Sequence, residues 1–440
     1  MDAGSAIVLI SVGVVLLVGF STFALISLRE GERRAARVTA LIGVLSGAML
    51  VGAGALPYVL RLGVAAAAVL AGSVMLLSLL LPVGTYMVPN GRPSRRVDER
   101  GIVFARARLE PGSAQYDSYY SMNPENRAGD DLTRSLPGLL SPHAREAEPE
   151  AFASARASFL VTEALEGAVD GPVAASRTDR SPAEASRSVK HLAEYYGALD
   201  VGITAVRDYH FYSHVGRGPG TYGEEIAVDD RWAIAFTVEM DHGAMRAAPE
   251  APVVAESARQ YVEAAKIGIQ LAATIRGMGY SARAHIDGNY QVIAPLVAVD
   301  AGLGEIGRMG ILMTPRLGPR VRLGVVTTEM PLVEDSPGDD PTVLDFCATC
   351  RKCAENCPSN SIPFGDREPI DGGLRWAIDA ESCFRYWNVI GTDCGRCMAV
   401  CPYAHPDSGA HNLVRWMMRH SGEARRAALW MDDLVYGRQL

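Results

Sequence analysis

All eight cysteines of this 440-residue chain lie between Cys347 and Cys401. They form two runs that each end in Cys-Pro: Cys347-x2-Cys350-x2-Cys353-x3-Cys357-Pro358 and Cys383-x10-Cys394-x2-Cys397-x3-Cys401-Pro402. In the first run, three thiolates are spaced to bind one iron–sulfur cube, and the fourth, next to proline, binds a second cube. The second run repeats this pattern with its first cysteine moved upstream. The spacing therefore predicts two 4Fe-4S clusters.

Because the fourth cysteine of each run crosses to the other cluster, two ligand sets of four are expected. They are Cys347, Cys350, Cys353 and Cys401 for one cluster, and Cys357, Cys383, Cys394 and Cys397 for the other. Disulfides and zinc are the alternatives. A reducing cytoplasm disfavours disulfides, and zinc sites usually pair two Cys-x2-Cys knuckles without this progression. Two cubes in series can carry electrons to a further centre.

The segment before the cysteines resembles the reductive dehalogenases, cobalamin-dependent enzymes that remove halide from organohalides. The resemblance runs from about Val97 to the second cysteine run and ends in the ferredoxin-like motif. It is carried by Asp98-Glu99-Arg100, Phe104-Ala105-Arg106, Gly112-Ser113, Tyr116, Tyr119-Tyr120, Pro124-Glu125, Val238-Glu239-Met240-Asp241, Gly279-Tyr280, Ala301-Gly302-Leu303-Gly304-Glu305-Ile306-Gly307-Arg308 and Gly318-Pro319-Arg320-Val321-Arg322.

The resemblance implies an α/β, nitroreductase-like core that holds base-off cobalamin with no axial ligand from the protein. The sequence agrees on one point, since Asp208-Tyr209-His210 does not complete the Asp-x-His-x-x-Gly pattern of histidine-bound cobalamin. We therefore expect His210 to be structural or pocket-lining. No cobalamin-contact residue is assigned.

The resemblance also implies catalytic roles for Tyr261 and Arg320. A phenol has an ordinary pKa of about 10, and an adjacent guanidinium stabilises the phenolate that remains after proton donation. Arg320 is thus expected to make Tyr261 a better acid. In other contexts, Tyr261 would be an ordinary core tyrosine of a helix and Arg320 a member of a surface ion pair.

At the third catalytic position the chain departs from the family pattern, because Asp287 stands where many relatives have an amide or a lysine. A carboxylate donates a hydrogen bond only when it is protonated. Asn289 is the alternative for the amide role.

Gly302-x-Gly304-x-x-Gly307 matches the dinucleotide-binding fingerprint. No clear βαβ unit surrounds it, and an acidic residue is not found at the usual distance of about 20 residues. A close-packed turn near the cobalamin is the preferred interpretation.

These side chains must be positioned by a core with both helices and strands. Strand-like runs at Trp232–Val238, Gln291–Val299 and Val321–Thr327 alternate with a helical stretch at Val254–Met278. We divide the chain into a membrane anchor (1–96), a wrapping or linker segment (97–188), a cobalamin-binding core (189–340) and a ferredoxin-like domain with a C-terminal tail (341–440).

Three stretches without Asp, Glu, Lys or Arg predict transmembrane helices at about 5–28, 38–60 and 63–88. A cleaved signal peptide is disfavoured for the first, because Asp2 and no basic residue precede it and two further spans follow. Basic loops stay in the cytoplasm. Arginines follow the first and third spans. We therefore expect the N-terminus on the outer side of the membrane and the catalytic region in the cytoplasm. These arginines are Arg29, Arg33, Arg34, Arg37, Arg92, Arg95, Arg96 and Arg100.

The net charge of −8 excludes binding of nucleic acid through a basic surface. The sequence thus predicts an enzyme of the inner membrane that cleaves the carbon–halogen bond of an organohalide at cob(I)alamin. Electrons reach it through two 4Fe-4S clusters. Membrane lipid is an expected partner, and the donor is a quinol, a membrane reductase or a cytoplasmic ferredoxin. The alternatives are an epoxyqueuosine reductase-like enzyme and a non-catalytic membrane electron-transfer protein.

Overall fold

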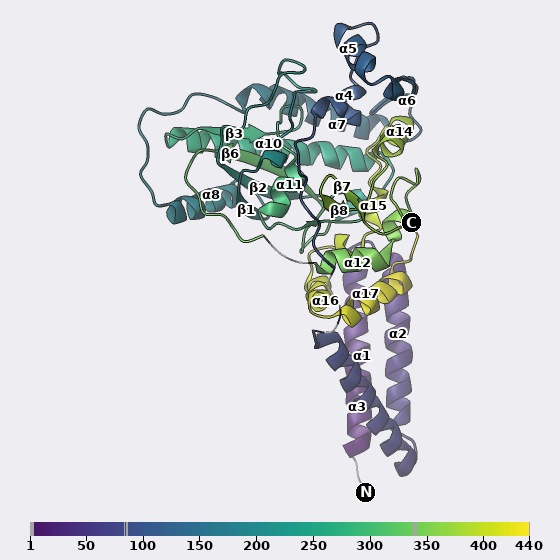
Figure 1. The fold of residues 1–440 in the computed structure, drawn as a ribbon. Helices are drawn as coiled ribbons and strands as arrows, with labels where there is room; N and C mark the ends of the chain where they lie inside the picture. The colour runs from purple at the N-terminus through teal and green to yellow at the C-terminus, as the bar shows by residue number, and fades with distance from the viewer. Residues whose placement is uncertain (1–3, 83, 85–86, 338–340, 440) are drawn as a thin grey trace. The chain divides into compact units, whose positions relative to one another are not determined.

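The computed structural model describes residues 4–82, 84, 87–337 and 341–439. It separates into two compact units (Figure 1). One contains residues 88–404, and the other joins residues 1–87 to residues 405–440. Residues 405–440, the C-terminal tail of the predicted division, are grouped with the three apolar N-terminal helices.

The larger unit is built on a four-stranded antiparallel sheet of order β1-β2-β6-β3. The strands are β1 (Val201–Ala205), β2 (Trp232–Glu239), β3 (Ala282–His285) and β6 (Val321–Thr328). Helices cover both faces of the sheet (Figure 1). The predicted mixed core of helices and strands is confirmed.

Alternation along β2 explains this layering, since successive side chains of a strand point to opposite faces. Ile234 and Phe236 pack with α8 (Pro182–Tyr196) and the long helix α10 (Ala251–Gly277). Ala233 and Ala235 pack with α11 (Ala294–Asp300) on the other face. Both faces are buried, so the strand is apolar almost throughout.

Position 324 in β6 has space only for glycine, because the side chain of its partner on β2 lies over it. Gly324 pairs with Phe236 of β2, and a Cβ at this position would lie 2.2 Å from the Phe236 ring. The ring therefore covers the glycine, and no larger residue fits without displacing it.

The strands at 232–238 and 321–327 and the helix at 254–278 are confirmed within one to three residues. The strand predicted at Gln291–Val299 is wrong. These residues enter α11, with Pro295 in its first turn, where the missing N–H of proline costs no helical hydrogen bond.

The 97–188 segment contains more regular structure than a linker. It forms α4 (Val103–Arg106), α5 (Ala114–Met122), α6 (Pro124–Arg134), α7 (Pro149–Leu165) and α8. The helix α7 packs along α10. This segment is therefore part of the wall of the core.

The iron–sulfur region wraps short elements around its cysteines. They are α12 (Thr342–Cys350), α13 (Lys352–Glu355), the hairpin β7 (Glu368–Ile370) and β8 (Gly373–Arg375), α14 (Ala380–Ile390) and α15 (Arg396–Ala399). Two further short strands, β4 (Glu305–Ile306) and β5 (Leu312–Met313), pair with each other. Another short helix, α9 (His242–Arg246), precedes α10.

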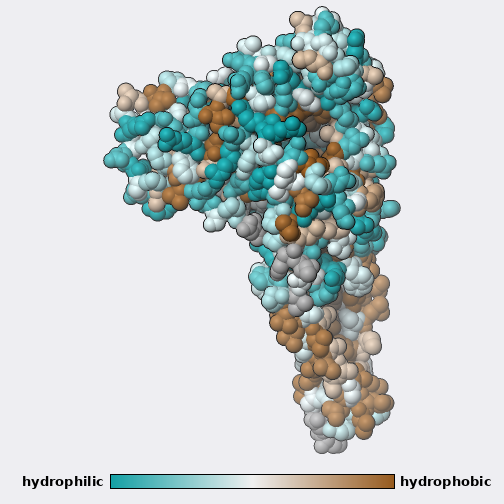
Figure 2. All heavy atoms as spheres, in the orientation of Figure 1, coloured by the Kyte–Doolittle hydropathy of each residue, from teal (hydrophilic) through white to brown (hydrophobic). Residues whose placement is uncertain are grey.

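The smaller unit contains three helices that are long and apolar enough to cross a membrane: α1 (Gly4–Arg29), α2 (Arg33–Ala53) and α3 (Tyr58–Leu80). Apolar side chains cover their surface (Figure 2). Two further helices, α16 (Gly409–His420) and α17 (Gly422–Val435), complete this unit.

The second and third helices begin earlier than predicted. Pro57 precedes α3 and separates it from α2, so the charge-free stretch to Leu60 does not form one helix. Arg61 consequently lies inside α3, where it donates to Ser5 Oγ at 3.0 Å. Three residues of the predicted third span, 83, 85 and 86, lie outside the described residues.

Candidate active site

A cavity of about 1220 Å³ lies within the larger unit. Its walls come from α7, α10, the loop after β3, the start of β6 and the loop before Cys394. Small-molecule sites usually have volumes of about 300–1,000 Å³. The space therefore exceeds that of an ordinary substrate pocket.

One face of α10 places Tyr261 in this cavity. Ser257, Tyr261, Ala264 and Ala265 all line it, and this spacing puts them on the same side of a helix. The ring of Tyr261 lies under the guanidinium of Arg322, whose central carbon is 5.1 Å from the ring centroid. A cation over a phenol ring is a favourable electrostatic contact.

The Arg322 guanidinium lowers the pKa of Tyr261, but burial and the nearby carboxyl groups of Asp287 and Asp393 outweigh it. The net pKa of Tyr261 is above its ordinary value of 10.0. The phenol therefore keeps its proton at neutral pH. It can donate that proton only to a strongly basic acceptor, such as a carbanion.

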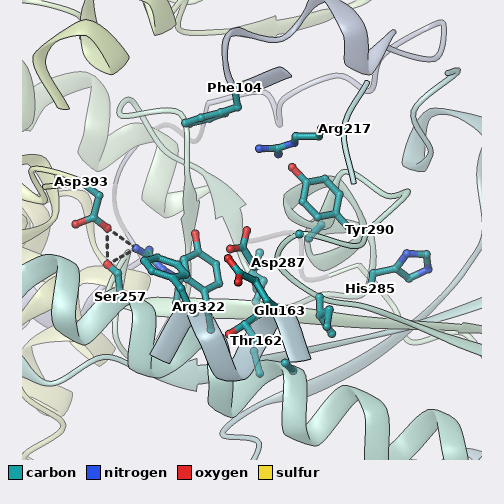
Figure 3. A pocket seen from close by; sticks show the side chains of 18 of the residues that line it. Phe104, Thr162, Glu163, Arg217, Ser257, His285, Asp287, Tyr290, Arg322 and Asp393 are labelled. Atoms are coloured by element: carbon teal, nitrogen blue, oxygen red, sulfur yellow. Dashed lines mark hydrogen bonds and ion pairs between the residues drawn. The ribbon is translucent and has the colours of Figure 1, made fainter. Parts of the chain in front are cut away.

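Arg322 is held from its other side by two polar partners. Its terminal nitrogen donates to Asp393 Oδ2 at 2.9 Å and to Ser257 Oγ at 2.6 Å. Ser257 in turn donates to Asp393. Figure 3 shows these three side chains joined at one side of the cavity.

The family resemblance predicts Arg320 beside Tyr261, but in the structure Arg322 takes this place and Arg320 lies elsewhere. Arg320 does not line the cavity. It is fully buried and donates to Ala404 O at 2.8 Å, to Glu239 at 2.7 Å and to Met240 O. The expectation that Arg320 adjoins Tyr261 is corrected, because Arg320 precedes β6 and bridges backbone segments, whereas Arg322 is inside the strand.

Asp287 lines the cavity after β3, as do Glu163 and Glu166 of the α7 region. Burial raises the pKa of Asp287, although Arg217, Arg108 and Arg322 each lower it. The raised pKa favours the protonated form, which can donate a hydrogen bond.

Asn289 is not available for the alternative amide role. It is buried, its Nδ2 donates to Glu166 O at 2.9 Å and its Oδ1 accepts from Arg283 at 2.7 Å. Both ends of the amide are therefore used in holding the loop after β3.

On the opposite wall, Arg217 lies between two aromatic rings (Figure 3). Its guanidinium carbon is 4.9 Å from the centroid of Tyr290 and 5.4 Å from that of Phe104. Its Nε donates to Glu99 at 3.1 Å. Sequence reasoning missed Arg217, because only the fold brings the segments around residues 99, 217 and 290 together.

Neither histidine of interest presents a free ring nitrogen to the cavity. His285 lines it, but its Nδ1 accepts from Gln291 N and its Nε2 contacts Thr327 Oγ1 at 3.0 Å. Burial lowers the pKa of His285 to about 3. His210 is fully buried outside the cavity and bonds to Asp300 at 2.8 Å, which agrees with the structural role predicted for it.

The eight cysteines are free thiols gathered in the iron–sulfur region. Burial raises the pKa of Cys401, with Cys347, Cys350 and Cys353 as the nearby thiols that raise it further. Cys383 has its pKa raised to about 12 by burial, with Cys357 and Cys394 nearby. In both cases the neighbours belong to the same predicted ligand set, whereas Cys397 also has Cys353 of the other set nearby. The assignment of ligands to clusters stays a prediction.

Such thiols become thiolates when iron replaces their protons, so the donor set fits iron–sulfur clusters. Among the described residues, no three His, Cys, Asp or Glu side chains could hold a single metal ion.

The loop that carries Cys394, a member of the second predicted ligand set, reaches the cavity. Cys394 and Gly395 both have positive φ angles, of 62° and 67°. A Cβ on Gly395 would lie 2.8 Å from Val253 of α10, so this turn packs tightly against the helix. Asp393, the residue before Cys394, lines the cavity and pairs with Arg322.

The glycine-rich turn at 302–307 does not have the dinucleotide-binding geometry. It follows α11 and leads into β4, whereas the fingerprint requires a strand before it and a helix after it. A Cβ on Gly307 would lie 2.6 Å from Met313 and 3.4 Å from Cys347 Sγ. The turn is close-packed, as expected, and it packs beside a cysteine of the first run.

Comparison with known proteins agrees with these features. A family model for the 4Fe-4S dicluster domain matches residues 346–405. A tetrachloroethene reductive dehalogenase from Sulfurospirillum multivorans is 34% identical over 291 residues, which is 58% of each chain. An epoxyqueuosine reductase from a Synechococcus strain is 28% identical over 162 residues, 32% of this chain and 46% of its own.

Among solved structures, a catabolic reductive dehalogenase in complex with 3-bromo-4-hydroxybenzoic acid has a TM-score of 0.64 and 26% identity. The match covers 81% of this chain and 50% of that one. The chain thus spans only 50–58% of the length of these two dehalogenases.

Proposed function

We propose that this chain, a homologue of the reductive dehalogenases, cleaves the carbon–halogen bond of an organohalide. The organohalide, two electrons and one proton give the dehalogenated product and a halide ion. One observation carries the proposal: the cavity that holds the protonated Tyr261 also includes Asp393, the residue next to the cluster ligand Cys394. A proton donor and an electron path therefore meet at one cavity.

The size of the cavity, about 1220 Å³, supports the binding of a bulky cofactor such as cobalamin, because ordinary small-molecule sites have about 300–1,000 Å³. Bound there, cobalamin would supply a two-electron reductant for the cleavage of the carbon–halogen bond. The base-off form without a protein axial ligand is supported by His285, whose two ring nitrogens are both engaged.

The two 4Fe-4S clusters are assigned to the crossed ligand sets. The sets are Cys347, Cys350, Cys353 and Cys401, and Cys357, Cys383, Cys394 and Cys397. Cys394 of the second set directly follows Asp393, which lines the cavity. The cluster bound by this set is therefore proposed as the one that passes electrons to the reaction centre.

Tyr261 is proposed as the proton donor to the dehalogenated carbon. Arg322 replaces Arg320 as the cation that stabilises the phenolate formed, because its guanidinium lies over the ring. Ser257 and Asp393 hold Arg322 in this position. Asp287, with its raised pKa, is proposed to donate a hydrogen bond that orients the substrate.

The three apolar helices are proposed to anchor the enzyme in the inner membrane. The C-terminus of α1, the N-terminus of α2 and the arginines Arg29, Arg33, Arg34 and Arg37 lie at one end of the spans. Arg61 bonds with Ser5 near the other end. The basic end is assigned to the cytoplasm, and a quinol, a membrane reductase or a cytoplasmic ferredoxin is the proposed electron donor.

Metal and corrinoid analysis of anaerobically purified protein tests the proposal. Two cubane clusters and one corrinoid correspond to about eight irons and one cobalt per chain. Iron without cobalt, in protein reconstituted with cobalamin, would leave only an electron-transfer function.

The similarity to epoxyqueuosine reductases supports a second candidate, since that relative matches about a third of this chain. Assays with a haloaromatic compound and with epoxyqueuosine-containing tRNA separate the two candidates. The net charge of −8 favours the organohalide, because a tRNA substrate requires a basic surface.

A further inference from the structure

The helices α16 and α17 expose apolar side chains to the outside of the smaller unit. Trp416 and Trp430 have 46% and 66% of their surface exposed. Three other large apolar side chains of these helices are also exposed: Leu413, Met431 and Leu434. Exposed tryptophan and aliphatic side chains on two helices that pack against each other are typical of an interaction site.

The buried faces of the same helices carry charged side chains beside the apolar Met418, Ala424 and Val435. Arg415 is buried and donates to Asn412 Oδ1 at 2.8 Å, and Arg425 is buried and donates to Met418 O at 2.9 Å. Asp432 is buried against His405, 2.7 Å away. Charged side chains are rarely buried in a water-soluble helix while large apolar ones stay exposed. The buried Arg415, Arg425 and Asp432, together with the exposed tryptophans, therefore favour an apolar environment outside these helices.

Contacts within the unit place these helices at one end of the membrane spans. His411 of α16 lies 5.9 Å from the Phe23 ring of α1, centroid to centroid, and 3.8 Å from Glu30. Ser421, between α16 and α17, donates to Ser78 O near the end of α3 at 2.8 Å. This is the end where Arg29, Arg33, Arg34 and Arg37 are located in the sequence.

We propose that α16 and α17 form an interfacial membrane-binding site whose ligand is a phospholipid surface with anionic headgroups. Trp416, Trp430 and their aliphatic neighbours insert at the boundary between headgroups and acyl chains, where tryptophan is enriched in membrane proteins. Arg419 and Arg426 of the same helices, with the arginines of the α1–α2 connection, attract the anionic headgroups. This inference rests on the proposed anchoring by α1–α3 and extends it to residues 405–440.

Tryptophan fluorescence in vesicles tests this site, because the spans contain none of the five tryptophans of the chain. The full-length protein is reconstituted into vesicles of mixed zwitterionic and anionic phospholipid, brominated either near the headgroup or deep in the acyl chain. Shallow bromines are expected to quench the emission of Trp416 and Trp430 at least about twofold, and deep bromines less.

The double variant Trp416→Phe/Trp430→Phe is expected to lose this depth-dependent quenching while still floating with the vesicles. Trp232→Phe, which removes an indole from β2, is the matched control and should retain it. Equal quenching of the wild type and the double variant would overturn the proposal.

Two other outcomes would also overturn it. In one, the protein floats with the vesicles and shows no quenching, but two copies crosslink at position 416. This would show that a second copy of the chain covers the exposed side chains of α16 and α17. Protein that does not float with the vesicles would overturn the anchoring by α1–α3 as well, which distinguishes the two failures.

Discussion

The guanidinium of Arg322 lies over the ring of Tyr261, with its central carbon 5.1 Å from the ring centroid. The same guanidinium is bonded to Asp393, which precedes a cysteine of the second cluster set. A single arginine therefore contacts both the proposed proton donor and the loop that carries the proposed electron donor. Substitutions that change the charge or the position of Arg322 are therefore the most direct tests of the proposed proton transfer.

Tyr261→Phe should abolish dehalogenation and leave the iron and cobalt content unchanged, because only the phenolic proton is removed. The expected loss of turnover is about 10²-fold or more, as for other general acids. Tyr280→Phe is a matched control, since Tyr280 donates to Thr178 O and does not line the cavity. Full activity of the Tyr261 variant would remove this residue from its proposed role.

Arg322→Gln should weaken Tyr261 as an acid. The guanidinium lowers the pKa of Tyr261, so its removal raises this pKa further above 10 and slows proton donation at every lower pH. The alkaline limb of the pH–rate profile, where the phenol loses its proton, should move to higher pH. Turnover at pH 8 should fall by about 10²-fold.

Two further variants control for this effect. Arg322→Lys keeps the positive charge and should retain the wild-type limb. Arg320→Gln should lower stability without moving the limb, because Arg320 bonds to Glu239 and to two backbone carbonyls and does not line the cavity. If the alkaline limb of the pH–rate profile moves in the Arg320 variant and not in the Arg322→Gln variant, Arg320 is the cation that acts on Tyr261.

Paired cysteine variants test the crossed ligand sets by iron content. Cys383→Ala should lose one cluster, so iron falls from about eight to about four per chain. Cys347→Ala/Cys401→Ala removes two ligands of one set and should also leave about four irons. Cys347→Ala/Cys357→Ala spans both sets and should lose nearly all iron. If this last variant keeps one cluster, each run binds its own cube.

Arg308→Met should destabilise the iron–sulfur region. Arg308 is fully buried and donates to Cys347 O, Pro363 O and Gly365 O at 2.7–2.9 Å. Leaving several carbonyls buried without donors costs about 1–3 kcal/mol each. The measurement is the denaturant midpoint at which the visible absorbance of the clusters is lost.

Arg351→Met is the control for charge, because it removes an exposed arginine from the same cysteine run. Its midpoint should change little. An equal loss in both variants would attribute the effect to charge and not to the hydrogen bonds of Arg308.

The iron–sulfur region, the core helix and the two central strands could be predicted, because each has a signal within a short stretch of sequence. The cysteine spacing needs no tertiary information, and the core helix and the two central strands carry long apolar patterns. The run 291–299 was misassigned because a short buried apolar run has no distinguishing period, although Pro295 in its first turn was a usable signal.

The candidate site depends on contacts that sequence spacing does not encode. Arg320 and Arg322 are two residues apart in one motif, and only the fold shows that the second of them faces Tyr261. Asp393 gave a weaker signal, as a carboxylate directly before a predicted cluster ligand. Arg217 gave none, because its neighbours Phe104 and Tyr290 are far away in the sequence.

The smaller unit is assembled from residues 1–87 and residues 405–440, which a ribosome makes at very different times. At about 5–20 residues per second, the intervening stretch takes roughly 15–60 s to translate. With the proposed anchoring, the three apolar helices therefore enter the bilayer before α16 and α17 are made. Until then Glu30 lacks its contact with His411, and residues 88–404 fold on a chain whose proposed anchor is already complete.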